Sequence, residues 1–437
     1  MLKKSILILI LTNFSLPAQS IFDNAVKSDI YSSTALNYEL NGYVRGGIYG
    51  GAVPEKSGYE TKERYGEAAL RLRLRKGQWG YAYSELRLRD ASSTENSISS
   101  FILREAYVNA YLGAFDLHIG QQVVHWGKAD GYNPTNVITP LDLLVFSPEE
   151  DDRRLSNFLI HSYYNWSELR LEVIWIPIYE PSLLPFAKVD LPEGIQLGEP
   201  EYPDEKIKHS SLALKLHYEG ASIDGTFSYF NGFMPMPALE QSAENNVFMI
   251  YPRAYRAYMI GADFSTTSGA YGLRGEFAYK NPIEKGNIRH FIPKRQVEYI
   301  LGLDREFGNL SLIVQYIGKY VFDHKDLLPI DQINPDFIKY KIALWNRMLC
   351  GQLKKWSNAI SFRPALKCFH ETLNLELLGQ INFSTEEIFL KLKISYDLAD
   401  DLTIVTGAQI FYGPKDTLLG LLDESNSAIF IELNASF

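Results

Sequence analysis

Arginine alternates with leucine in one short segment, and this spacing suits the binding of anions. In "ALRLRLRKGQWGYAYSELRLRD", Arg71, Arg73 and Arg75 precede a turn, and Arg87 and Arg89 follow it. Residues two apart in a strand share a face, so these guanidinium groups would form one basic surface. Guanidinium groups bind carboxylates and phosphates through planar, forked hydrogen bonds. The segment therefore predicts a surface that attracts anionic solutes.

The leucines of this hairpin define the opposite face. If they meet lipid, every arginine points inward, because arginine on a lipid face near mid-membrane costs about 2 to 4 kcal/mol. Counting across the three-residue turn gives the cross-strand pairs that we expect on the inner face. These pairs are Arg71 with Tyr83, Arg73 with Tyr81, and Glu67 with Arg87.

The same alternation assigns an inward direction to charged residues on other segments. They are Asp116, His118, Arg170, Glu172, Lys391 and Lys393. Two interpretations stay open: any water-filled lumen must be polar, or the arginines form a filter for anionic solutes and carboxylate-bearing amphiphiles.

The elements that must position these residues are alternating strands. The first 20 residues read as a signal peptide, with two lysines, an apolar run and small residues before the expected cleavage site, so the mature chain would span 21–437. Beyond them no apolar stretch is long enough for a membrane helix, and the chain holds 28 Tyr, 24 Phe and 6 Trp with 22% charged residues. An alternating strand could line a soluble core or face lipid outside and water inside. With the signal peptide, this composition favours an outer-membrane β-barrel, while the formal charge of −9 argues against nucleic-acid binding.

Turn signals divide the mature chain into strands of one antiparallel up-and-down barrel. Eight short turns separate longer polar loops, which predicts 18 strands, with 16 as the alternative, and short turns on the periplasmic side. Residues 336–356 could form a helix within a loop or the upper part of a strand. Cys350 and Cys368 could pair in an oxidising compartment or remain free thiols.

The third long loop, from His125 to Arg154, is too apolar to stand in water, and its prolines stiffen it. We expect it to fold into the lumen. Its acidic and basic run, Glu149, Glu150, Asp151, Asp152, Arg153 and Arg154, would then face the arginines across a constriction. The alternative is a solvated acidic turn that holds a divalent cation.

Three segments resemble a poorly characterised family of porin-like outer-membrane proteins of Gram-negative bacteria. They are "GQQVVHWGKADGYNPTNVITP", "FRPALKCFHETLNLELLGQINFSTEE" and "FYGPKDTLLGLLDESNSAIFIELNASF". The signature residues are Gln121, Trp126, Gly127, Asp130, Asn133, Pro140 and Phe437. The resemblance implies an outer-membrane barrel that transports small solutes or hydrophobic compounds. The signature would fix the loop through the turn at Asn133 and Pro134 and a packed Trp126, and Phe437 is similar to the terminal signal that the barrel-assembly machinery recognises.

Catalytic chemistry finds little support in the sequence. The eight histidines are scattered, and neither G-x-S-x-G nor H-E-x-x-H occurs, so we expect no enzyme, cofactor or metal site. The sequence instead predicts a passive channel whose partners are outer-membrane lipid, lipopolysaccharide, the assembly machinery and small solutes. The alternatives are an occluded barrel that serves export of hydrophobic compounds, lipids or polymers, and a structural or adhesion protein. The oligomeric state is not predicted.

Overall fold

A computed structural model describes residues 36–53, 58–93, 97–184, 195–244, 247–283, 291–330 and 336–437. The predicted signal peptide, residues 1–20, lies outside the described residues, so its cleavage remains a prediction.

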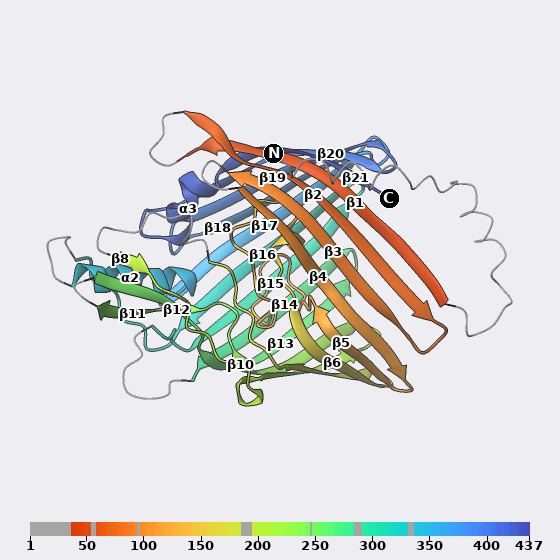
Figure 1. Cartoon of the computed structure of the whole chain (residues 1–437), viewed down its shortest axis with the longest axis horizontal. Coiled ribbons are helices and arrows are strands. Elements are labelled where there is room, and N and C mark those ends of the chain that lie inside the picture. Colours follow the sequence, from red (N-terminus) through yellow and green to blue (C-terminus); the bar gives the residue numbers. More distant parts are fainter. Residues whose placement is uncertain are drawn as a thin grey trace, which may run out of the picture.

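The described residues form a closed antiparallel barrel of 18 strands, as predicted (Figure 1). Each strand pairs with its neighbours in the barrel, and β21 pairs with β1 to close it. The strands are β1 (Leu36–Ala52), β2 (Tyr59–Lys76), β3 (Gly80–Ser93), β4 (Ser97–Leu112), β5 (Phe115–Gln122), β6 (Asn157–Trp166), β7 (Leu169–Ile176), β9 (Ser211–Glu219), β10 (Ile223–Phe233), β13 (Arg256–Ser268), β14 (Tyr271–Pro282), β15 (Gln296–Phe307), β16 (Leu310–Val321), β17 (Trp356–Cys368), β18 (Leu373–Asn382), β19 (Glu387–Ala399), β20 (Leu402–Tyr412) and β21 (Ala428–Ser436).

Side chains alternate between an apolar outer face and a polar inner face. On β2, Leu70 points outward and is 42% exposed, whereas Glu67 points inward and is 5% exposed. On β6, Tyr164 and Trp166 point outward, while His161 is buried toward the interior. This division is that of a barrel with lipid outside and polar side chains in its lumen.

The eight predicted short turns all join neighbouring strands at one end of the barrel. The first of them shifts a predicted register. We expected Arg71 opposite Tyr83, Arg73 opposite Tyr81 and Glu67 opposite Arg87, but these residues face Glu85, Tyr83 and Arg89 respectively. The turn occupies residues 77–79, one position later than predicted, because Lys76 pairs with Gly80. A turn displaced by one residue moves every partner by two and keeps the same face inward.

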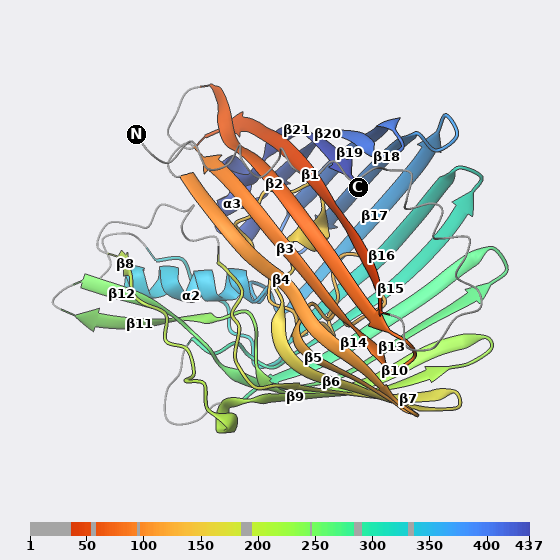
Figure 2. The same cartoon turned by 45° about the vertical axis from the view of Figure 1, so that its right-hand side comes forward.

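The long loops pack together at the other end, as Figure 2 shows for α2 beside β8, β11 and β12. β8 (Ile195–Leu197), β11 (Ala238–Glu244) and β12 (Val247–Arg253) form a small sheet, and α3 (Leu418–Asn426) contacts β20. Residues 336–356 contain α2 (Phe337–Leu349), which decides for the helix alternative. Trp345 and Met348 of α2 pack against Leu239 and Ile250 in a loop cluster. Neither of these helices, among the residues described, is long and apolar enough to cross a membrane.

Phe437 pairs with Gly42 of β1, and the two cysteines are not joined by a disulfide. Phe437 exchanges two backbone hydrogen bonds with Gly42, with N···O distances of 2.9 and 3.0 Å, and its side chain is 62% exposed. Cys350 and Cys368 are free thiols, so the pairing that an oxidising compartment could bring does not occur here.

Candidate functional site

The third long loop, residues 123–156, lies inside the barrel and bonds to strands around the lumen. Asp130 is 2.9 Å from Arg363 of β17, Glu149 bonds to Lys393 of β19, and Asp152 is 2.8 Å from Arg45 of β1. A loop that reaches β17, β19 and β1 must cross the interior. The predicted insertion of this loop is therefore confirmed.

Glu276 of β14 anchors the first half of the loop, because five donors of the loop converge on its carboxylate. One oxygen accepts from the Thr135 amide at 2.7 Å and the Thr135 hydroxyl at 2.8 Å. The other accepts from the amides of Lys128 at 3.2 Å and Ala129 at 3.3 Å, and from Asn133 Nδ2 at 3.3 Å. A buried carboxylate that collects this many donors fixes the loop backbone strongly.

Glycine is required where the loop wraps around this carboxylate. Gly127 has a φ of 103°, and a Cβ placed on it would lie 2.6 Å from both Asn133 Nδ2 and a Glu276 oxygen. Any side chain would meet both a strained backbone and the anchor itself.

Two further contacts hold the same segment. The Asp130 amide donates to Gln315 Oε1 at 2.8 Å, and Gln315 Nε2 donates to the Asp130 carbonyl at 2.7 Å. Trp126, 2% exposed, donates to Glu172 Oε1 at 3.1 Å. The Lys215 ammonium lies 5.3 Å from the Trp126 ring centroid, close enough for a cation–π interaction.

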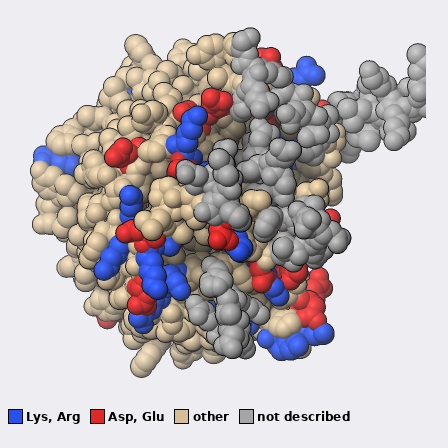
Figure 3. Space-filling model, turned by 90° about the vertical axis from the view of Figure 1, so that its left-hand side faces the viewer, with Lys and Arg blue, Asp and Glu red and all other residues tan. Residues whose placement is uncertain are grey.

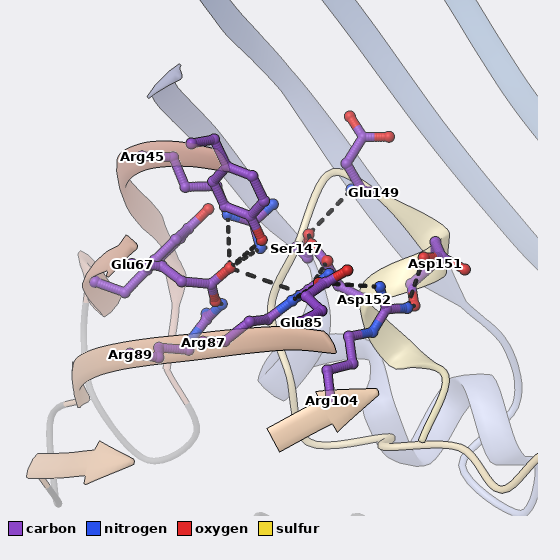
Figure 4. A network of polar contacts seen from close by, with 12 residues as sticks. Arg45, Glu67, Glu85, Arg87, Arg89, Arg104, Ser147, Glu149, Asp151 and Asp152 are labelled. Atoms are coloured by element: carbon purple, nitrogen blue, oxygen red, sulfur yellow. Dashed lines mark hydrogen bonds and ion pairs between the residues drawn. The ribbon is translucent and has the colours of Figure 1, made fainter. Parts of the chain in front are cut away.

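The second half of the loop ends in an ion-pair network with β1 to β4, shown in Figure 4. Asp152 bonds to Arg87 at 2.7 Å as well as to Arg45, and Asp151 bonds to Arg104 at 2.6 Å. The wall supplies its own acids, Glu67, which is 2.6 Å from Arg45, and Glu85, which is 2.6 Å from Arg87. Arg89 bonds to Glu63 and to the Phe146 carbonyl of the loop.

The network keeps Asp152 ionised. Burial alone would raise the pKa of its carboxyl, but the positive charges of Arg45 and Arg87 and a hydrogen bond from Ser147 outweigh burial and lower the pKa to about 2. The acidic residues of the loop and the arginines of the wall therefore form a latch, that is, a set of ion pairs that ties the second half of the loop to the barrel wall. The carboxylates of Asp151 and Asp152 bind arginines, and the described residues contain no group of three or more candidate metal ligands.

The predicted inward residues occupy two different environments. Arg87, Arg89, Glu67 and Glu172 are enclosed by partners, and Lys391 is 6% exposed. Toward the short-turn end, Arg71 is 3.0 Å from Glu85 with its side chain 38% exposed, and Arg73 is 45% exposed. Arg75 and Asp116 lie there too, exposed and half-buried respectively.

Several residues of this site were not predicted. They are Arg45, Glu85, Arg104, Asp263, Glu276 and Gln315, all inward-facing residues of the wall. Glu85 shares the alternation of Arg87 and Arg89 and could have been found from it. Glu276 shares the alternation of β14 with Arg274 and Lys280, but its partners lie in a loop more than 140 residues earlier in the chain.

Two cavities lie on opposite sides of the loop, and His125 lines both. The outer cavity, on the long-loop side, has a volume of about 490 Å³ and is lined by Met234, Met348 and Lys319 among others. The inner cavity, on the short-turn side, has a volume of about 390 Å³ and is lined by His118 and other ring-bearing residues. Burial, with the charges of Arg154 and Lys215, lowers the pKa of His125 to about 4. His125 is therefore neutral at neutral pH.

Charged side chains of both signs mark the long-loop end of the barrel, which Figure 3 views directly. Lysines and arginines lie beside aspartates and glutamates on this face rather than forming a region of one sign. The described residues on this face are therefore mixed in charge.

Comparison with solved structures supports the same architecture. The chain is similar to OccAB4 of Acinetobacter baumannii, with a TM-score of 0.55 and 10% identity over 92% of this chain and 98% of that one. OccK5 of Pseudomonas aeruginosa gives a TM-score of 0.53 and 9% identity over 92% and 97% of the two chains. OccAB3 of A. baumannii gives 0.52 and 11% identity over 92% and 99%.

Sequence comparison gives no such match. No family model and no curated protein matches the chain, so the family suggested by the loop signature remains a prediction. At these identities the structural likeness shows the fold alone: the described residues form a closed antiparallel barrel like those of these structures.

Proposed function

We propose that the chain is an outer-membrane channel for the passive passage of small solutes, with the third loop as its constriction. The observation that carries this proposal is a loop anchored to strands on several sides of the lumen, with a cavity on each side of it. A loop held in this way narrows the lumen to a defined size. The structural neighbours, which are outer-membrane porins, support the same function.

The arginines of the barrel wall have two different roles in this proposal. Arg45, Arg87 and Arg104 bind acids of the loop or wall at short range, so their charge is largely compensated. Arg73 is 45% exposed, its nearest acid Glu39 lies 3.9 Å away, and Arg75 is exposed. We assign any anion preference to Arg73 and Arg75 rather than to the buried network, because exposed guanidinium groups remain able to bind passing anions.

Conductance in a planar bilayer tests both parts. The purified mature protein should give stable open steps, and its reversal potential under a salt gradient should show a preference for anions. Replacing Arg73 and Arg75 with Gln should shift that potential toward cations. Lys76→Gln is the matched control, since it removes a positive charge at the same strand end but on the outer face. An equal shift in the control, or none in the double variant, would refute the assignment.

An occluded barrel is the second candidate, and one observation favours it. The loop is bonded to β1, β3 and β4 on one side and to β14, β16 and β17 on the other, while long loops pack over the outer cavity. Silent insertion of a folded barrel would favour this candidate, and export of hydrophobic compounds, lipids or polymers, or a structural or adhesive role, would then lead.

Contacts with lipopolysaccharide and with the barrel-assembly machinery belong to the same proposal. The apolar outer face supports the first, and the exposed terminal Phe437 supports the second.

A further inference from the structure

We propose that the inner cavity is a binding subsite for small, uncharged planar ring compounds. This inference rests on the proposed function, because it places the subsite on the solute's route beneath the constriction. The observation behind it is a series of aromatic and imidazole rings on β4, β5, β6 and β9.

These rings follow the wall from β4 to β9. Ring centroids are 5.8 Å apart for Tyr107 and His118, 5.5 Å for His118 and His161, 4.5 Å for His161 and Tyr163, and 6.5 Å for Tyr163 and His217. All five rings line the same cavity of about 390 Å³. This volume lies within the range of small-ligand sites.

Hydrogen bonds hold these rings in place before any ligand arrives. The Nε2 atoms of His161 and His217 donate to the two oxygens of Glu172 at 2.9 and 2.7 Å, and Trp126 donates to the same carboxylate. Asn109 Nδ2 lies 2.7 Å from His118 Nε2. A surface fixed in this way loses little side-chain entropy on binding, which favours recognition of a flat partner.

The charged groups that line the cavity have partners, among them Glu105, which accepts from the Val123 amide at 2.9 Å, but the side chain of Arg170 is 38% exposed. Lys215, 5% exposed, is 3.2 Å from Asp263, and Arg170 Nη2 is 3.2 Å from Glu219. The Arg170 guanidinium also lies 5.1 Å from the Tyr163 ring centroid. Glu172 is saturated by its donors. Apart from the partly exposed Arg170, the cavity therefore offers ring faces more than free charge.

A route to the cavity passes His125. This residue lines both cavities, and its imidazole hydrogen-bonds to Asn136 at 3.3 Å. The imidazole of His125 is neutral at neutral pH and adds no charge of its own between the two cavities. The preference for flat, uncharged compounds therefore comes from the rings of the inner cavity.

Direct binding and channel block test the proposal together. Benzamide and cyclohexanecarboxamide share the amide and the ring size and differ in planarity, so their comparison isolates the ring face. Calorimetry on the purified barrel should show benzamide binding more tightly, and benzamide should interrupt single-channel current. Tyr163→Leu should weaken benzamide binding about three- to tenfold, the effect of one aromatic contact.

Tyr164→Leu is the matched control, because the neighbouring ring on β6 faces outward and is 40% exposed. It should leave binding unchanged. Tyr107→Leu repeats the test if Tyr163→Leu fails to fold. Equal affinity for the two amides, tighter binding of methyl α-glucoside than of benzamide, or unchanged affinity in both tyrosine variants would overturn the subsite. Binding without any conductance would keep the subsite and refute the open channel instead.

Discussion

Replacing Glu276 with Gln should release the first half of the third loop while the barrel stays folded. Glutamine keeps one carbonyl oxygen and turns an NH₂ group toward donors of the loop. At least two of the five contacts from Lys128, Ala129, Asn133 and Thr135 are then lost. A hydrogen bond to a charged group contributes about 1.5 to 3 kcal/mol, so the loop should lose about 3 kcal/mol of local stability.

Hydrogen exchange measures this loss directly. About 3 kcal/mol corresponds to a roughly hundredfold larger population of the open loop, since each tenfold change is about 1.4 kcal/mol. The amides of Lys128, Ala129 and Thr135 should therefore exchange about a hundred times faster, and open-channel current should become noisier. Strand amides of β14 should keep their protection.

Glu306→Gln is the matched control, because Glu306 is exposed on the neighbouring strand β15 and its replacement removes the same charge. If residues 127–135 keep their protection in a folded Glu276→Gln barrel, the carboxylate cradle does not hold the loop. The anchoring scheme would then rest on Gln315 and Trp126 instead.

Three further changes test other parts of the molecule. Asp152→Asn should lower the stability of the closed loop by about 2 kcal/mol at neutral pH. This figure follows from the pKa of the Asp152 carboxyl, which the folded protein lowers from 3.8 to about 2. Since that pKa is depressed, the stabilisation is complete above about pH 4 and is lost as the pH falls toward 2. In the unmodified chain, the sensitivity of the loop to protease should therefore rise across this pH range. Leu70→Arg should cost about 2 to 4 kcal/mol in a denaturant titration of the barrel in lipid if this face meets the membrane. Deleting Phe437 removes its two backbone hydrogen bonds to Gly42 and the exposed ring. In cells, the fraction of the protein that is folded, measured by its heat-dependent mobility on a gel, should fall. Refolding of the purified chain should change little.

The hairpin around Arg71 shows which features local sequence determines. Alternation assigned the correct inner face to every arginine, because the period of a strand depends only on the chain itself. The cross-strand partners were displaced by two residues, because register depends on where a three-residue turn begins, and both Gly77 and its neighbours are compatible with a turn. The face of the strand on which a residue lies can therefore be predicted more reliably than its cross-strand partner.

The third loop shows the opposite limit. Its insertion could be predicted from apolar residues that have no place in water, but its anchors could not. Glu276 is one of several polar residues of β14, and Gln315 is one of several polar residues of β16. Both gain their role from residues 128 to 135 across the lumen. The residues next to them in the sequence do not indicate a partner so far away along the chain. Asp152, in contrast, could be matched to arginines because both belong to visible runs of charged residues.

The loop also explains why the wall carries so many buried charges. A lumen enclosed by 18 strands is too wide for wall side chains to meet across it. Acids such as Glu67 and Glu172 bind donors on neighbouring strands, whereas Glu276 takes five donors from the loop. The loop supplies backbone amides to Glu276 of β14 and acids to the arginines of β1, β3 and β4. Each half of the loop is thus complementary to the wall that it meets, and a substitution on the wall alone removes a partner from a buried charge of the loop. For this reason we expect wall and loop charges to act as pairs: Arg87→Gln combined with Asp152→Asn should cost less than the sum of the two single changes in a double-mutant cycle. Strict additivity would show that the two side chains do not interact in the folded barrel.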